Sequence, residues 1–206
     1  MVKGKDVKLI GIGKQYDQIA AFWNEQHLNS DYGVAQIEKA LSYARNSRRA
    51  LDVGCGAGGR LVRRLIARGF DVTGLDASAE MIKLAQLNNP KATFFQANIE
   101  EWETDQTYDF ILAWDCLFHL PLKAQKPVLS KLCSWLEKDG VLIHSFGDAI
   151  GGDHIDQWRG QDFAYSSIGI AQNIELLADN GLTCLHLELD QFPEKHVYAI
   201  SVKAVR

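Results

Sequence analysis

From residue 49 onward, the sequence alternates short apolar segments with longer segments in which apolar residues recur every three or four positions. The short segments are typical of buried strands, and the longer ones are typical of amphipathic helices packed on a sheet. The expected strands lie at residues 50–53, 70–76, 92–97, 108–114 and 141–146. This alternation predicts parallel strands joined by right-handed crossovers, with helices on both faces of the sheet.

The segments after residue 120 complete the expected sheet. Helices are predicted at residues 122–137 and 168–180, and the glycine-rich, polar segment at residues 147–167 is expected to be a loop. Two further strands, 182–190 and 196–204, are separated by too few residues for a crossover helix, so they are expected to pair antiparallel. The prediction is a sheet of parallel strands closed by an antiparallel pair.

The chain length favours one folded domain. At 206 residues it has the size of a single domain, and its content of 47% hydrophobic and 23% charged residues suits a chain with a buried core. Residues 16–45 are predicted to be helical, with a break near residues 29–33. We therefore expect one domain over residues 1–206, in which an N-terminal helical flap (1–48) lies on a core (49–206).

Charge and hydropathy narrow the choice of partners. The formal net charge is −4, so the chain lacks the basic surface expected of a nucleic-acid-binding protein. Neither a signal peptide nor a membrane span of roughly 18 apolar residues is recognisable. The four cysteines are scattered, which favours free thiols in a reducing compartment, and no metal-site spacing is found. We therefore expect a cytoplasmic protein that binds neither nucleic acid nor a membrane.

A glycine cluster follows the first expected strand, where ligands bind in open α/β sheets. Gly54, Gly56 and Gly59 match the G-x-G-x-x-G pattern of dinucleotide binders, whereas Gly54, Gly56 and Gly58 match G-x-G-x-G. Asp52 favours the second interpretation. A carboxylate beside the loop repels a pyrophosphate but attracts a ligand that carries an ammonium and a sulfonium group.

Asp76 ends the second expected strand. A carboxylate there can accept hydrogen bonds from both hydroxyls of a ribose, whichever class of nucleoside ligand binds. The other interpretation is an acidic residue that stabilises the N-terminus of the following helix. We favour the ribose role, because Asp76 and the glycine cluster both lie at the ends of expected strands, where ligands bind.

Four segments occur in the order and spacing of a known family: ALDVGCGAGGR, VTGLDASAEMIKLA, FFQANIEEW and YDFILAWDCLFHL. Together they resemble the class I S-adenosyl-L-methionine-dependent methyltransferases over residues 49–146, and the closing helix and hairpin extend the resemblance to the C-terminus. The resemblance implies a three-layer α/β fold with a Rossmann-like, seven-stranded sheet, mostly parallel with an antiparallel last strand. It also implies S-adenosyl-L-methionine as the cofactor and S-adenosyl-L-homocysteine as its product.

The resemblance assigns cofactor roles to residues in each motif. They are Asp52, Gly54, Cys55, Gly56 and Gly58 around the methionine end, Asp76 at the ribose, Ala77, Met81, Asn98 and Ile99 around the adenine, and Trp114 and Asp115 where the cofactor faces the substrate. The family often has Asp where Asn98 stands, but the amide oxygen can still accept a hydrogen bond from the adenine amino group. Core packing is the alternative role for Trp114 and Met81.

The acceptor side is expected to be built from the flap and the loop at residues 147–167. The predicted substrate-binding residues are Tyr16, Trp23, Tyr32, His154 and Tyr165. The pair Gly151-Gly152 could hinge a lid, and a flap with a lid suits a small-molecule acceptor. His119 is the candidate catalytic residue, with capping of a short helix as the alternative. Methyl transfer mainly requires alignment of the acceptor with the C–S bond, so no base is obligatory.

Two functions of other classes stay open at this point. An NAD(P)-dependent oxidoreductase would share the glycine loop, but it needs a catalytic domain, and only about 60 residues follow the fifth expected strand. A non-catalytic cofactor-binding module would keep the glycines and both aspartates without turnover. Comparing the binding of S-adenosylhomocysteine with that of NADH distinguishes the first alternative.

Overall fold

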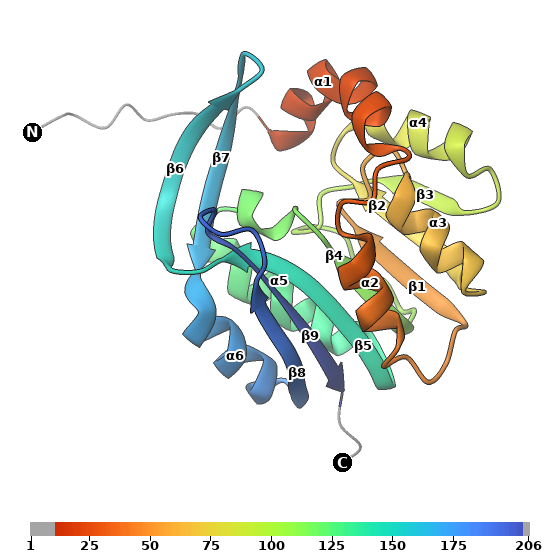
Figure 1. Cartoon of the computed structure of the whole chain (residues 1–206), viewed down its shortest axis with the longest axis vertical. Helices are drawn as coiled ribbons and strands as arrows, with labels where there is room; N and C mark the ends of the chain where they lie inside the picture. The colour runs from red at the N-terminus through yellow and green to blue at the C-terminus, as the bar shows by residue number, and fades with distance from the viewer. Residues whose placement is uncertain (1–10, 204–206) are drawn as a thin grey trace, which may run out of the picture.

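A computed structural model describes residues 11–203 of the chain. A seven-stranded sheet crosses the molecule in the order β3-β2-β1-β4-β5-β9-β8 (Figure 1). Its strands are β1 (Arg49–Val53), β2 (Asp71–Asp76), β3 (Thr93–Gln96), β4 (Tyr108–Ala113), β5 (Leu136–Gly147), β8 (Leu182–Leu189) and β9 (His196–Lys203). Neighbouring strands pair parallel except around β9, which lies antiparallel between β5 and β8. The predicted sheet, with its antiparallel last strand, is confirmed.

Helices cover both faces of the sheet, because successive strand residues point to opposite sides. On one face lie α2 (Val34–Leu41), α3 (Arg60–Ala67) and α4 (Ala79–Asn88), and on the other lie α5 (Leu122–Trp135) and α6 (Gly169–Asp179). Within β4, Phe110 and Leu112 belong to the first of these cores and Ile111 to the second. The molecule therefore has the three layers that the sequence predicts.

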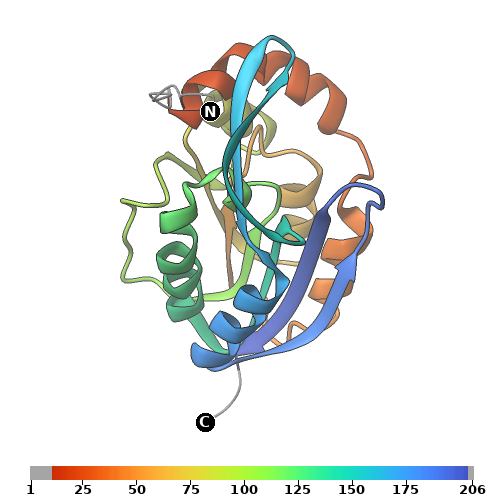
Figure 2. The same ribbon diagram turned by 90° about the vertical axis from the view of Figure 1, so that its left-hand side faces the viewer.

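The N-terminal helix α1 (Ile12–His27) lies across the carboxyl-end edge of the sheet (Figures 1 and 2). The predicted break after it is observed, and α2 begins after Gly33, whose φ of 76° suits glycine. Ile37 of α2 is fully buried in the sheet core. Residues 1–10 of the expected flap lie outside the described residues, and the boundary at residue 48 stays a prediction.

The prediction of a loop at residues 147–167 is wrong. β6 (Ile150–Trp158) and β7 (Gln161–Ile168) form an antiparallel hairpin outside the main sheet, and β7 contacts α1 (Figures 1 and 2). Its two-residue turn, Arg159 and Gly160, has φ of 50° and 74°, and positive φ at both positions matches the twist of paired strands. The expected hinge Gly151-Gly152 falls inside β6, beside a register irregularity.

β5 also begins earlier than predicted. α5 ends one residue before Leu136, so residues 137–140 belong to a strand rather than to the end of a helix. Leu136 pairs with Tyr108 at the start of β4, and a register shift follows this pair. Pairing with the neighbouring strand thus outweighs continuation of the helix, and Gly140 lies within β5 instead of terminating α5.

All four cysteines are free thiols, with Cys55 and Cys133 buried. Within residues 11–203, no helix is both long and apolar enough to cross a membrane. In the same part of the chain, no three His, Cys, Asp or Glu side chains are grouped so that they could hold a metal ion.

Candidate active site

A pocket opens where β1, β2 and β4 end, beneath α1. Its lining includes most of the residues that the resemblance assigns to the cofactor: Asp52, Gly54, Cys55, Gly56, Asp76, Ala77, Met81, Asn98, Ile99, Trp114 and Asp115. Gly58 lies elsewhere, against α4, where an added Cβ would be 3.0 Å from Ala85. The motifs therefore converge on one pocket, and Gly58 packs against α4 instead of lining it.

The glycine loop has a backbone that side chains would disrupt. Gly54 and Gly56 have φ of 70° and 53°, in the left-handed region that favours glycine. A Cβ on Gly54 would lie 2.4 Å from the Cβ of Cys116, whereas a Cβ on Gly56 would lie 3.4 Å from the indole nitrogen of Trp23. The main-chain N–H groups of Gly54 and Cys55 donate to Leu75 O at 2.8 and 2.9 Å, which fixes the loop to β2.

Asp76 is held by the main chain around it. Its Oδ2 accepts a hydrogen bond from Gly56 N at 2.9 Å, and its Oδ1 accepts one from Ser78 N at 2.8 Å. Burial raises the pKa of Asp76 to about 6, although these two bonds act in the opposite direction. A carboxylate offers about four acceptor positions, so lone pairs remain for two hydroxyls of a ribose.

Asp52 is a buried carboxyl that faces the pocket, with 2% of its surface exposed. Within residues 11–203, no side chain or main-chain group donates a hydrogen bond to it. Burial, reinforced by the charge of Asp76, raises the pKa of Asp52 to about 8. The Asp52 carboxyl is therefore largely protonated at neutral pH until a cation, such as a ligand ammonium group, enters the pocket. The attraction to a cationic ligand that the sequence predicts depends on this loss of the proton.

Arg60 supplies the complementary charge at the start of α3. Its Nε donates to Tyr32 O, its guanidinium lies 5.1 Å from the centre of the Tyr32 ring, and it lines the same pocket as Asp52. A guanidinium has five N–H donors, so donors remain for a carboxylate ligand. Asp52 and Arg60 together fit the ammonium and carboxylate groups of an amino acid.

The residues predicted around the adenine have both ligand-facing and structural roles. Met81 lines the pocket but is 1% exposed and packs with Ala20 and Ala57, so both of its predicted roles are compatible with the structure. Asn98 lines the pocket while its amide oxygen accepts a hydrogen bond from Glu100 N at 3.0 Å. Trp114 likewise lines the pocket and belongs to the sheet core.

A tyrosine–histidine pair also lines the pocket. Tyr16 Oη of α1 is 3.0 Å from Nε2 of His119, which belongs to the single turn η1 (Leu117–His119). His119 Nδ1 is 2.8 Å from Ala164 O of β7. Since a carbonyl only accepts, Nδ1 carries the hydrogen and Nε2 accepts one from Tyr16. Burial lowers the pKa of His119 to about 4 and raises that of Tyr16, so both are neutral at pH 7.

Aromatic side chains from α1 and the hairpin surround this pair. The ring of Tyr16 lies 5.8 Å from that of Trp23 and 5.1 Å from that of Phe163, and Trp158 lies 6.0 Å from Trp23. Tyr165 packs beside His119 at 4.8 Å. α1, η1 and the hairpin therefore enclose this part of the pocket.

The predicted substrate-binding residues do not all reach this pocket. Tyr16 and Trp23 line it, and Tyr165 packs behind His119. Tyr32 instead donates a hydrogen bond to Asp115 Oδ2 at 2.8 Å, outside the lining. His154 is exposed on β6 and stacks on Tyr165 with ring centres 5.7 Å apart. The structure therefore places two of the five predicted residues in the pocket lining and a third against His119.

Comparison with known proteins decides the family. The methyltransferase-domain family matches this chain over residues 25–187. The chain belongs to this family. Its sequence relatives include the ubiquinone biosynthesis O-methyltransferases of Rickettsia typhi, 30% identical over 148 residues (64% of this chain, 58% of the relative), and Rickettsia akari, 40% identical over 99 residues (46% and 38%). The chain thus spans about half the length of these curated relatives, and the match gives no support to an oxidoreductase.

Solved structures share the fold of this methyltransferase domain. The DhpI complex with SAH has a TM-score of 0.71 at 22% identity, covering 94% of this chain and 95% of that one. Magnesium protoporphyrin IX methyltransferase (ChlM) from Synechocystis PCC 6803, with bound SAM, has a TM-score of 0.67 at 20% identity and the same coverage. At such identities the likeness concerns the fold.

Sequence reasoning missed several residues that the fold brings to the site. Arg60 and His27 line the pocket, and His196 contacts the pocket residue Asp115 from the start of β9. Arg60 follows the glycine cluster directly, so its position was a usable signal for an anion-binding role. His196 is 81 residues from Asp115 and carries no local pattern.

Proposed function

We propose that this protein is an enzyme that transfers a methyl group from S-adenosyl-L-methionine to a hydroxyl oxygen of a small, uncharged molecule. The observation that carries the proposal is a single pocket whose lining includes Asp52 and Asp76 together with the Tyr16–His119 pair. Membership of the methyltransferase-domain family supports methyl transfer. The names of the two Rickettsia relatives support an oxygen acceptor.

The cofactor-binding end of the pocket fits S-adenosyl-L-methionine, which when bound supplies a methyl group activated by its positive sulfur. Asp76 accepts hydrogen bonds from the ribose, and the side chains of Met81 and Ile99 flank the adenine. Asp52 pairs with the ammonium group and Arg60 with the carboxylate of the methionine end. These roles satisfy a buried carboxyl that otherwise has no donor among residues 11–203.

The Tyr16–His119 pair provides a route for the proton that the acceptor loses. When bound, the cofactor would supply the methyl group for the new O–CH₃ bond, the electrons of the C–S bond would stay on sulfur, and the acceptor oxygen would have to lose its proton. The hydroxyl proton passes to Tyr16 Oη while the Tyr16 proton passes to His119 Nε2, and Nδ1 keeps its hydrogen on Ala164 O. A weak base suffices, because an oxygen that has gained a methyl group releases its proton readily.

The surroundings of the pair define the acceptor. Tyr16, Trp23 and Phe163 form an aromatic wall, and His119 is neutral because burial lowers its pKa to about 4. A charged acceptor buried against this aromatic wall would lose much of its hydration. The wall therefore favours a flat, uncharged acceptor, and the net charge of −4 argues against nucleic acid.

Calorimetry and turnover test the proposal together. We expect S-adenosylhomocysteine to bind the pocket and NADH to leave it empty. With a radiolabelled methyl donor, small phenols and alcohols should become labelled, and matched amines should not. Preference for NADH would overturn the cofactor assignment. Labelling of amines alone would overturn the oxygen acceptor, and tight cofactor binding without labelling of any acceptor panel would favour the non-catalytic module.

A further inference from the structure

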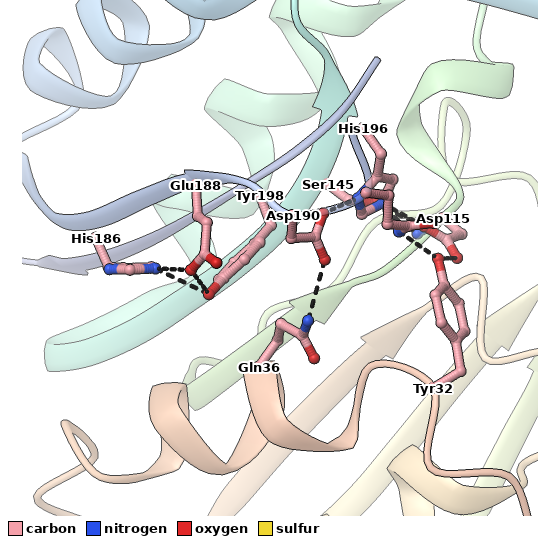
Figure 3. Close-up of polar contacts among 10 residues, drawn as sticks. Tyr32, Gln36, Asp115, Ser145, His186, Glu188, Asp190, His196 and Tyr198 are labelled. Atoms are coloured by element: carbon pink, nitrogen blue, oxygen red, sulfur yellow. Dashed lines mark hydrogen bonds and ion pairs between the residues drawn. The ribbon is translucent and has the colours of Figure 1, made fainter. Parts of the chain in front are cut away.

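His196, the first residue of β9, lies between two carboxylates (Figure 3). Its Nε2 is 2.9 Å from Asp115 Oδ1, and its Nδ1 is 2.6 Å from Asp190 Oδ1. All three side chains are largely shielded from solvent, with 12% of His196, 18% of Asp115 and 4% of Asp190 exposed. Asp115 lines the pocket, whereas Asp190 lies in the β8–β9 connection and accepts a further hydrogen bond from Gln36 of α2 at 3.0 Å.

This arrangement requires a charged imidazole. Ionised carboxylates only accept hydrogen bonds, so both ring nitrogens of His196 must donate, which only the imidazolium form can do. Burial by itself lowers the pKa of His196, but the hydrogen bonds and charges of Asp115 and Asp190 raise it, and the net shift is upward. The ring also lies 5.3 Å from that of Trp114.

Asp115 connects this histidine to the pocket and to the N-terminal segment. Its backbone has φ of 53°, a conformation that residues other than glycine adopt at some cost in energy, and its N–H donates to Ser145 Oγ at 2.7 Å. Its Oδ2 accepts from Tyr32 Oη at 2.8 Å, and Tyr32 O in turn accepts from Arg60. His196 is therefore connected to Arg60 by three consecutive hydrogen bonds, through Asp115 and Tyr32.

We propose that His196 is a positioning residue for the cofactor: as an imidazolium bridging Asp115 and Asp190, it holds Asp115, Tyr32 and Arg60 in the arrangement that binds the methionine end. The inference rests on the proposed function. Its consequence is that cofactor affinity depends on a proton that no cofactor atom touches, and that deprotonation of His196 weakens binding.

The effect of pH on cofactor affinity through His196 is opposite to its effect through the other titrating groups of the site. Asp52 and Asp76, with pKa values raised to about 8 and about 6, bind a cationic ligand better as the pH rises. Loss of the His196 proton acts in the opposite direction, at a pH above the ordinary histidine range. The groups that face His196 are Asp115 from the end of β4 and Asp190 from the β8–β9 connection, with Tyr32 and Arg60 beyond Asp115.

His186→Gln offers a matched control. His186 also bonds a carboxylate on the same pair of strands, with Nε2 2.8 Å from Glu188 Oε2, but it lies along β8 away from Asp115 (Figure 3). Asp190→Asn is a second test variant that keeps an acceptor for His196 and removes one charge outside the pocket. It keeps the proposal testable where His196→Gln does not fold.

The experiment measures the Kd of S-adenosylhomocysteine by calorimetry from pH 5.5 to 9.5, together with the ¹⁵N chemical shifts of the histidine rings. We expect the wild-type His196 ring to be an imidazolium at pH 7. His196→Gln should weaken binding at pH 7 about tenfold, the equivalent of one hydrogen bond to a charged group. In this variant, the decrease in affinity that deprotonation of His196 causes at alkaline pH should be absent. Asp190→Asn should move that loss to lower pH, and His186→Gln should match the wild type.

The ammonium group of the ligand titrates in the same way in the experiments on all four proteins. Differences in the pH dependence of Kd between these proteins are therefore due to groups of the protein. A neutral His196 ring at pH 7, or wild-type Kd values at every pH in both His196→Gln and Asp190→Asn, would overturn the inference. Failure of the wild type to bind S-adenosylhomocysteine would overturn the proposed function itself, and this inference with it.

Discussion

At the scale of single residues, Asp52 makes opposite contributions to folding and to binding. Because burial raises its pKa from 3.8 to about 8, the folded state binds a proton more tightly than the unfolded state, and the stability it contributes falls as the pH rises from about 4 to 8. Asp52→Asn removes this loss. We expect the variant to be more stable than the wild type at pH 8, by about 1–3 kcal/mol, and to approach it at pH 4.

Denaturant unfolding at both pH values measures the first effect, and calorimetry with S-adenosylhomocysteine should show that the same variant binds at least about tenfold more weakly. Asp71→Asn, at the exposed start of β2, is the control for loss of a carboxylate. An Asp52→Asn protein with unchanged affinity would remove Asp52 from the binding site.

Tyr16→Phe tests the proposed route of the proton. The substitution removes the hydroxyl that donates to His119 Nε2 and leaves the aromatic ring in place. We expect kcat to fall by about 10- to 100-fold, at the lower end of general acid–base effects, with the Kd of S-adenosylhomocysteine unchanged. Tyr43→Phe, a partly buried tyrosine of the sheet core, is the matched control in the same kinetic assay. Equal loss in the two variants would contradict a role for Tyr16 in the chemistry.

The predicted residues that line the pocket are those that belong to local sequence patterns. Asp52 is the penultimate residue of β1 and Asp76 is the last residue of β2, and each lies beside a recognisable motif. His196 and Asp115 are 81 residues apart, and only the insertion of β9 beside β5 brings them together. Gly58 matches the glycine pattern, but packing against α4 rather than contact with the pocket explains it.

At the scale of elements, β1 and β4 are predictable because they are buried on both faces and therefore mostly apolar. The β6–β7 hairpin is not: glycine, aspartate and histidine in β6 obscure any alternation, and most of that strand is exposed. The Arg159-Gly160 turn was a usable signal, since glycine at the second turn position accepts the positive φ of a two-residue hairpin. The hairpin is held by its contacts with α1, η1 and α5, which no local pattern reveals.

The hairpin is expected to affect acceptor binding and to leave cofactor binding intact. Trp158 of β6 packs against Trp23 and Phe22 of α1, at 6.0 and 6.1 Å between ring centres. Trp158→Ala removes both aromatic contacts, each worth about 0.5–1.5 kcal/mol, so the KM of the acceptor should rise about tenfold. The Kd of S-adenosylhomocysteine should stay within about twofold of wild type. Ile155→Ala, on the same strand, controls for loss of an apolar side chain. A rise in that Kd equal to the rise in KM would mean that the hairpin shapes the whole pocket.

At the scale of the whole molecule, the pocket is built from segments spread along the chain: α1, the ends of β1 and β2, and the turn after β4. A ligand that contacts all of them binds only the folded state, so it must stabilise the entire domain. At a concentration of one hundred times its Kd, S-adenosylhomocysteine is expected to add about 2.7 kcal/mol, which for a chain of this size raises Tm by about 5–10 °C.

Thermal unfolding in the presence of S-adenosylhomocysteine, with NADH at the same concentration as the control, checks this expectation. Gly56→Val adds a second control, because its side chain would meet both Trp23 and a backbone with positive φ. That variant should unfold cooperatively and show no shift with either ligand. Stabilisation of the wild type by NADH alone would mean that the glycine loop binds a pyrophosphate, and that the carboxyl of Asp52 does not select a cation.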